Sequence, residues 1–67
     1  MVFVFKTDIS IGLETKVKTI LSSLKTIDKV GFDFEDCDNI LRIEAQKDIV
    51  SDIESLLISK GFLCKEL

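Results

Sequence analysis

The sequence predicts a small α+β fold in which two helices cover one face of a four-stranded antiparallel sheet. Apolar residues recur at every second position in residues 30–34 and 41–45, which is typical of strands with one buried face. In residues 13–24 and 49–57 they recur with a helical period of about 3.6. The 67 residues contain no proline, and no linker or low-complexity stretch divides them. We therefore expect a single domain over residues 1–67.

The first part of the chain predicts a strand followed by a helix. Residues 2–7 are rich in β-branched and aromatic side chains, which favour a strand. The apolar residues that follow are spaced by four, three, one and three positions, so they share one helical face: Leu13, Val17, Ile20, Leu21 and Leu24. We expect this helix to end near Thr26.

Residues 29–45 predict a β-hairpin. Two runs of alternating apolar residues form its strands: Val30, Phe32, Phe34 and Leu41, Ile43, Ala45. The turn-forming residues 36–39 lie between the runs and connect them. Arg42 is expected on the same outer face as Asp33 and Glu35, where charge pairs across the strands would stabilise the hairpin.

A second helix and a short strand complete the predicted fold. Asp48 is the expected N-cap, and Gly61 is the expected helix terminator. The inner face of this helix is expected to carry Ile49, Ile53, Leu56 and Leu57. Residues 62–67 would form the last strand. The order strand, helix, strand, strand, helix, strand predicts a ferredoxin-like βαββαβ plait, and right-handed crossovers give the strand order 4-1-3-2.

Composition excludes several classes of function. The formal net charge of −3 argues against nucleic-acid binding, which needs a basic surface. Because the chain has no histidine, no Ser-His-Asp or Cys-His site can be assembled, and we expect neither an enzyme nor a bound cofactor. No apolar run is long enough to insert into a membrane, and residues 1–6 lack the features of a signal peptide. Two cysteines without Cys-x-x-Cys spacing favour a reduced, cytoplasmic protein.

Three short motifs agree in order and spacing with one family. They are Val17 with the segment 21–24, the pair Ile27 and Val30, and the C-terminal set Ile53, Leu56-Leu57 and Gly61-Phe62. Together they resemble heavy-metal-associated domains, which are the copper chaperones and the N-terminal modules of metal-transporting P-type ATPases. The resemblance covers nearly the whole chain and implies the same plait.

The resemblance also implies that the metal site of that family has been lost. It places Ser10 and Leu13 at the two cysteines of the Cys-x-x-Cys loop and Asp8 at a methionine that is usually buried. Cu(I) selects soft thiolates, whereas a hydroxyl is a poor soft ligand and a leucine has no donor atom. From the residues themselves, we expect a tight turn and helix start with a capping role in this degenerate loop: Asp8, Ile9, Ser10, Ile11, Gly12 and Leu13.

The two cysteines allow one weak alternative. Cys37 lies in the hairpin turn among Glu35, Asp36 and Asp38, which makes it a candidate ligand for a metal ion. The surrounding carboxylates raise a thiol pKa and reduce its reactivity, so an exposed acidic turn is the favoured interpretation. Cys64 is expected to be a small buried apolar residue.

An apolar patch on the outer sheet face is the candidate interface. If the phenylalanines of the first strand face the helices, Val2 and Val4 face outward, and the last strand should place Leu63 and Leu67 beside them. The leading hypothesis is therefore a non-enzymatic domain that acts by protein contact, either as a homodimer or with another protein. One alternative is a copper-chaperone-like metal carrier that uses Cys37 or a site shared between two chains. Another is a regulatory module that binds a small molecule at the strand–helix junctions.

Overall fold

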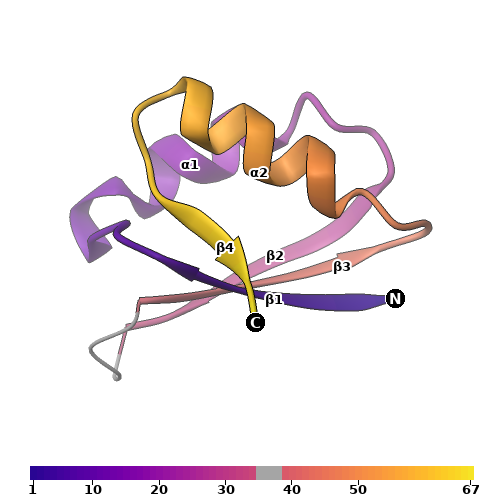
Figure 1. The fold of residues 1–67 in the computed structure, drawn as a ribbon, viewed down its shortest axis with the longest axis horizontal. Helices are drawn as coiled ribbons and strands as arrows, with labels where there is room; N and C mark the ends of the chain where they lie inside the picture. The colour runs from indigo at the N-terminus through magenta and orange to yellow at the C-terminus, as the bar shows by residue number, and fades with distance from the viewer. Residues whose placement is uncertain (35–38) are drawn as a thin grey trace.

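The computed structural model describes residues 1–34 and 39–67 and contains the elements that the sequence predicts. Along the chain these are β1 (Val2–Thr7), a short 3-10 helix η1 (Ile11–Leu13), α1 (Glu14–Leu21), β2 (Ile27–Asp33), β3 (Ile40–Ala45), α2 (Val50–Ser59) and β4 (Cys64–Glu66). Both α-helices lie on one side of the sheet (Figure 1). Among the described residues, no helix is long and apolar enough to cross a membrane.

Within the described residues the four strands form one antiparallel sheet in the order β2-β3-β1-β4. This is the predicted order 4-1-3-2, which is confirmed. The register pairs Phe3 with Ile43 and Phe5 with Leu41, so the apolar residues of the two central strands share the face beneath the helices. Their neighbours along each strand, including Val4 and Arg42, face the other way.

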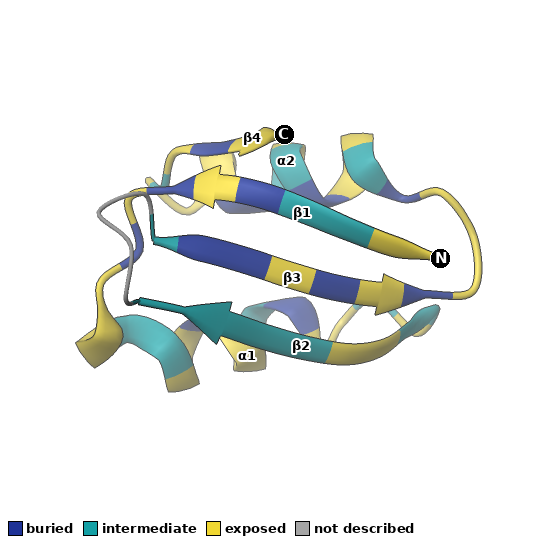
Figure 2. Ribbon diagram, turned by 90° about the horizontal axis from the view of Figure 1, so that it is seen from below, coloured by how far each residue is buried: buried dark blue, intermediate teal, exposed yellow. Residues whose placement is uncertain are grey.

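The core lies between the helices and the two central strands. Its fully buried side chains come from both helices, both central strands and the β1–α1 junction: Phe5, Ile9, Val17, Leu21, Leu41, Ile43, Ile53 and Leu57. In Figure 2, which shows the outer face of the sheet, the buried residues concentrate on β1 and β3, whereas β2 is mostly half-buried. Each of these buried side chains contributes roughly 1.5–3 kcal/mol of hydrophobic stabilisation.

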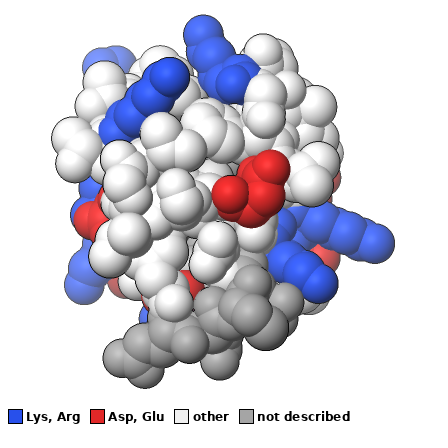
Figure 3. Space-filling view, turned by 90° about the vertical axis from the view of Figure 1, so that its left-hand side faces the viewer, with Lys and Arg blue, Asp and Glu red and all other residues white. Residues whose placement is uncertain are grey.

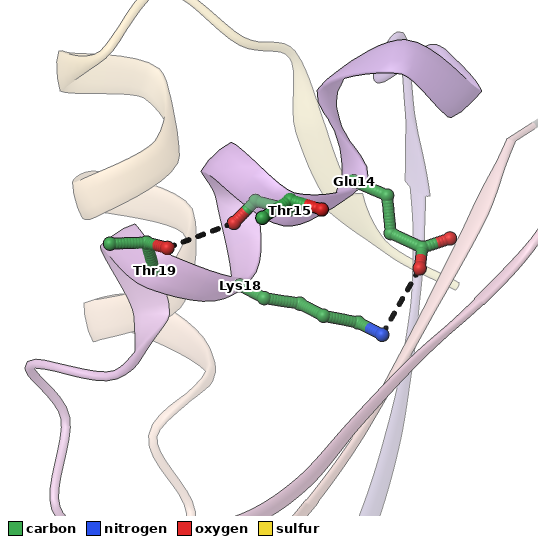
Figure 4. A network of polar contacts seen from close by, with 4 residues as sticks. All are labelled: Glu14, Thr15, Lys18 and Thr19. Atoms are coloured by element: carbon green, nitrogen blue, oxygen red, sulfur yellow. Dashed lines mark hydrogen bonds and ion pairs between the residues drawn. The ribbon is translucent and has the colours of Figure 1, made fainter.

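The first helix is shorter than its apolar period predicts. It ends at Leu21 rather than near Thr26, although Leu24 still packs on the core. The hydroxyls of Ser22 and Ser23 donate hydrogen bonds to the carbonyls of Thr19 and Ile20, and such local bonds compete with continuation of a helix. The exposed face of α1 carries an ion pair from Lys18 Nζ to Glu14 Oε2 at 3.1 Å, one turn apart (Figure 4).

The second helix begins and ends close to the predicted residues. Asp48 Oδ1 accepts a hydrogen bond from the Val50 N–H at 3.1 Å, so its carboxylate serves the helix start from one position before the N-cap. At the other end Gly61 has φ +93°, a left-handed conformation that favours glycine. The Phe62 N–H then bonds the carbonyl of Leu57 at 3.0 Å, which completes the glycine termination.

Candidate functional site

The β1–α1 junction, residues 7–13, is the candidate site that the sequence singled out. It lies at the end of the molecule where the connection between α2 and β4 also passes (Figure 1). Thr7 is buried, and its Oγ1 donates to the carbonyl of Asn39 at 2.7 Å and accepts from the N–H of Ile9 at 3.2 Å. The end of β1 is therefore bonded both to the start of β3 and to the loop that follows it.

Asp8 connects this junction to the last strand. Its Oδ1 accepts a hydrogen bond at 2.8 Å from the N–H of Leu63, which is 55 residues away. The resemblance aligns Asp8 with a methionine that is usually buried, whereas Asp8 itself is exposed and Ile9 is the fully buried side chain. The sequence did carry a signal for Ile9, because it is an apolar residue between two polar ones and lies four positions before Leu13.

The predicted tight turn and helix start are confirmed, with Ser10 at the N-cap position of η1. Ser10 precedes η1 with φ −84° and ψ 162°, and within the described part of the chain its hydroxyl makes no capping bond. The turn is closed by the backbone instead, through a 2.9 Å bond from the Leu13 N–H to the Ser10 carbonyl. Local backbone bonding thus starts the helix here, and the side chain of Ser10 stays exposed.

The junction offers no soft ligands at the two positions that the resemblance assigns to cysteines. Ser10 supplies an exposed hydroxyl, and the side chain of Leu13 packs half-buried against the core. Within residues 1–34 and 39–67, no group of three or more His, Cys, Asp or Glu side chains is arranged to hold a metal ion. The second candidate ligand, Cys37, and its acidic neighbours lie outside the described residues.

Cys64 is a free cysteine in the core, as the sequence predicted. Burial, together with the nearby negative charge of Glu54, raises the pKa of the Cys64 thiol from 9.0 to about 12. The thiol therefore stays protonated at neutral pH. A protonated thiol is a poor nucleophile and a poor metal ligand.

A cavity of about 470 Å³ opens beside the junction. Residues from the end of β1, from α2 and from the start of β4 line it: Lys6, Thr7, Asp8, Ile58, Leu63, Cys64 and Lys65. Its volume falls within the range of small-molecule sites, and its walls are mainly apolar. The two lysines occupy paired positions on β1 and β4.

The structure divides the four residues of the predicted outer-face patch. The Leu67 N–H bonds the carbonyl of Val4 at 2.9 Å, so these two residues are neighbours, and Val2 lies further along the same face. Leu63 lies beyond the other end of β4, and the paired positions of Lys6 and Lys65 come between it and Leu67. Val2, Val4 and Leu67 therefore form one region, from which Leu63 is separated.

Leu63 lies instead near Ile58, since both residues line the cavity beside the junction. The exposed fractions of Leu63 and Ile58 are 68% and 57%. Figure 3 views the molecule from the side at the left of Figure 1 and shows an uncharged area with an acidic group beside it and basic residues around it. Sequence reasoning missed Ile58, although it follows the inward-facing Leu57 and so lies outside the buried helical face.

The comparison with solved structures confirms the fold. The chain is similar to the N-terminal domain of ZntA, solved in solution in the apo-form, with a TM-score of 0.82 over 98% of this chain and 90% of that chain. The two sequences are 20% identical, a level at which the likeness establishes the fold alone. No protein-family model matches the chain, and no curated protein matches its sequence significantly. The predicted four-stranded βαββαβ plait is thus confirmed.

Proposed function

We propose that this chain is a non-catalytic protein-contact domain with a heavy-metal-associated-like fold, in which the former metal loop has a structural role. The observation that supports this most directly is the bond from the Leu63 N–H to Asp8 Oδ1, which commits the loop to fastening the last strand. Leu13 supports the same proposal, because its packing on the core turns a ligand position into part of the fold. We further propose a reducing, cytoplasmic setting, consistent with a free buried Cys64.

A metal titration tests the proposal. Cu(I) and Zn²⁺ are added separately to the full chain in the presence of a competing chelator while amide NMR shifts are recorded. We expect no saturable shifts at residues 8–13. The matched control is the double variant Ser10→Cys with Leu13→Cys, which restores a Cys-x-x-Cys loop and should bind Cu(I) against the same chelator.

The same titration also tests the competing hypothesis that the chain is a metal carrier. Shifts at residues 36–39 that persist against the chelator, and that disappear in Cys37→Ser, would establish a metal site at the hairpin and contradict the proposal. A stoichiometry of one metal ion per two chains would instead indicate a site shared between them.

A second candidate function, small-molecule binding, is favoured by the cavity beside the junction. Its apolar wall of Ile58 and Leu63 and its flanking lysines would suit a small anion with an apolar body. Screening carboxylates of increasing chain length by thermal shift tests this candidate. Stabilisation that is lost in Ile58→Glu would support the candidate, whereas equal melting temperatures across the series would contradict it.

A further inference from the structure

The two edges of the sheet differ in length and in how they are held. β4 has three residues. Backbone N–H groups within it and on either side of it already donate hydrogen bonds to Asp8, Glu54 and Val4. β2, at the opposite edge, has seven residues. An edge strand of that length presents backbone N–H and C=O groups that can pair with another strand. The longer edge is therefore the part of the sheet best suited to bind a second strand.

The side chains of β2 separate into a charged face and an apolar face. Lys29, Gly31 and Asp33 lie on the outer face, opposite residues of β3 that also point away from the helices. Val30 and Phe32 lie on the helix side and remain half-buried. The ring of Phe32 stacks on Phe34 at 5.2 Å between centroids. Both faces of this edge therefore retain surface that a second strand could cover.

Symmetry limits the ways in which two copies of β2 can pair. A two-fold axis perpendicular to the sheet makes the strands antiparallel, and paired residues must lie on the same face. The axis must then lie midway between the two copies of one residue, which face each other across the strand pair. An axis at Lys29 would place the two copies of that lysine opposite each other. With an axis at Val30 or Phe32, Lys29 of one copy would not lie opposite Asp33 of the other.

An axis at Gly31 gives complementary pairs throughout residues 29–33. It places Lys29 of each copy opposite Asp33 of the other, Val30 opposite Phe32, and uncharged Gly31 opposite itself. Asp33 has a further interaction within its own chain, but a carboxylate accepts several donors, so both interactions can be made together. This charge complementarity names the occupant of the edge, which is a second copy of the chain.

We propose that the chain forms a two-fold homodimer through antiparallel pairing of β2 strands about Gly31, which joins two sheets into one of eight strands. This inference rests on the proposed protein-contact function and specifies its partner. One strand pair buries less surface than a standard interface, so the dimer should be weak, with dissociation at roughly micromolar concentrations or above.

Charge reversal at two positions tests the register. Sedimentation equilibrium and light scattering are recorded up to roughly 1 mM, because small interfaces bind weakly. Lys29→Glu would place two acidic residues opposite each other twice per dimer, and Asp33→Lys would do the same with two lysines. Each variant should weaken dimerisation by about tenfold to a hundredfold.

Mixing the two single variants makes the prediction specific. Each is expected to be monomeric alone, but together they restore opposite charges at both positions and should form a heterodimer. The double variant with Lys29→Glu and Asp33→Lys should dimerise like the wild type. Amide NMR spectra of all variants establish that they are folded, which matters because Lys29 also faces Glu44 within its own chain.

The matched control is Lys65→Glu, which changes the same charge on the other edge strand and should leave the dimer intact. A wild-type chain that stays monomeric throughout the concentration range would overturn the inference. The inference would also be overturned if neither Lys29→Glu nor Asp33→Lys weakened dimerisation, or if only Lys65→Glu did. None of these results changes the metal titration, so a protein-contact function with a different partner would still stand.

Discussion

The two strand–helix junctions of this fold carry the same dipeptide and use it differently. Asp8-Ile9 follows β1, and Asp48-Ile49 follows β3. In both pairs the isoleucine is buried, with exposed fractions of 0% and 4%. The Asp48 carboxylate accepts the N–H of Val50 two residues ahead, whereas the Asp8 carboxylate accepts the N–H of Leu63, 55 residues away.

The difference shows that equivalent positions in the two halves have separate tasks. At the second junction the aspartate serves the start of its own helix. At the first, the aspartate fastens β4, and the helix starts through a backbone-bonded 3-10 turn. The loop that the sequence resemblance aligns with a metal-binding loop is thus the one that carries a long-range bond.

The largest expected effect is on the shared feature, the buried isoleucine. Ile9→Ala and Ile49→Ala should each lower the free energy of unfolding by about 2–5 kcal/mol, because each leaves a cavity in the core. Urea denaturation measures the loss. Ile11→Ala, which truncates a 72% exposed side chain in the same loop, is the control and should change stability by less than about 0.5 kcal/mol. Equal losses for Ile9 and Ile11 would refute the structural role of Ile9.

Removing each aspartate side chain should destabilise a different part of the molecule. Asp8→Ala and Asp48→Ala should each cost about 1 kcal/mol, since each removes one acceptor from a backbone N–H. Amide hydrogen exchange should accelerate along β4 in the first variant and at the first turn of α2 in the second. Faster exchange confined to the loop around position 8 in Asp8→Ala would contradict the proposed role of Asp8 in holding β4.

The smallest effect at neutral pH is expected at Cys64, which lines the cavity beside Asp8. Its folded-state pKa is raised from 9.0 to about 12, so the unfolded chain releases the thiol proton near pH 9 while the folded chain keeps it. The stability that depends on Cys64 is therefore complete below about pH 9 and is lost as the pH rises toward 12.

A comparison of wild type with Cys64→Ala checks this sign. The urea midpoint of the wild type should exceed that of the variant at pH 7, and the difference should shrink steadily above about pH 9. All other side chains are common to the two proteins, so their contributions cancel in the difference. A difference that stays constant between neutral and alkaline pH would show that the thiol ionises alike in both states.

Local patterns in the sequence were sufficient for the elements and their order. Residues 2–7 and 40–45, the two amphipathic helices and the glycine at position 61 follow from short-range spacing, and the structure confirms them. The end of α1 did not follow, because the apolar period continues to Leu24 while Ser22 and Ser23 end the helix with their hydroxyls. Apolar period and local hydrogen bonding were in conflict there, and the hydrogen bonding prevailed.

The candidate site was harder to predict than the fold. The sequence identified the loop and its missing thiolates, but it did not show that Asp8 accepts a hydrogen bond from Leu63. That bond could not be read from local spacing, because Leu63 lies near the other end of the chain. The outer-face patch shows the same limit, because alternation predicts the face of Leu63 but not the lysine pair that separates it from Leu67.

By itself, the sequence determined which segments become strands and helices, which faces are apolar, and that positions 10 and 13 hold no thiolate. These properties depend on residues that are only a few positions apart in the chain. The regular backbone geometry of helices and strands fixes which of these residues share a face. The tertiary structure alone decided that Asp8 reaches Leu63 and that Thr7 bonds Asn39 at the start of β3. These outcomes require distant segments to meet, and their geometry is set by the packing of the whole core.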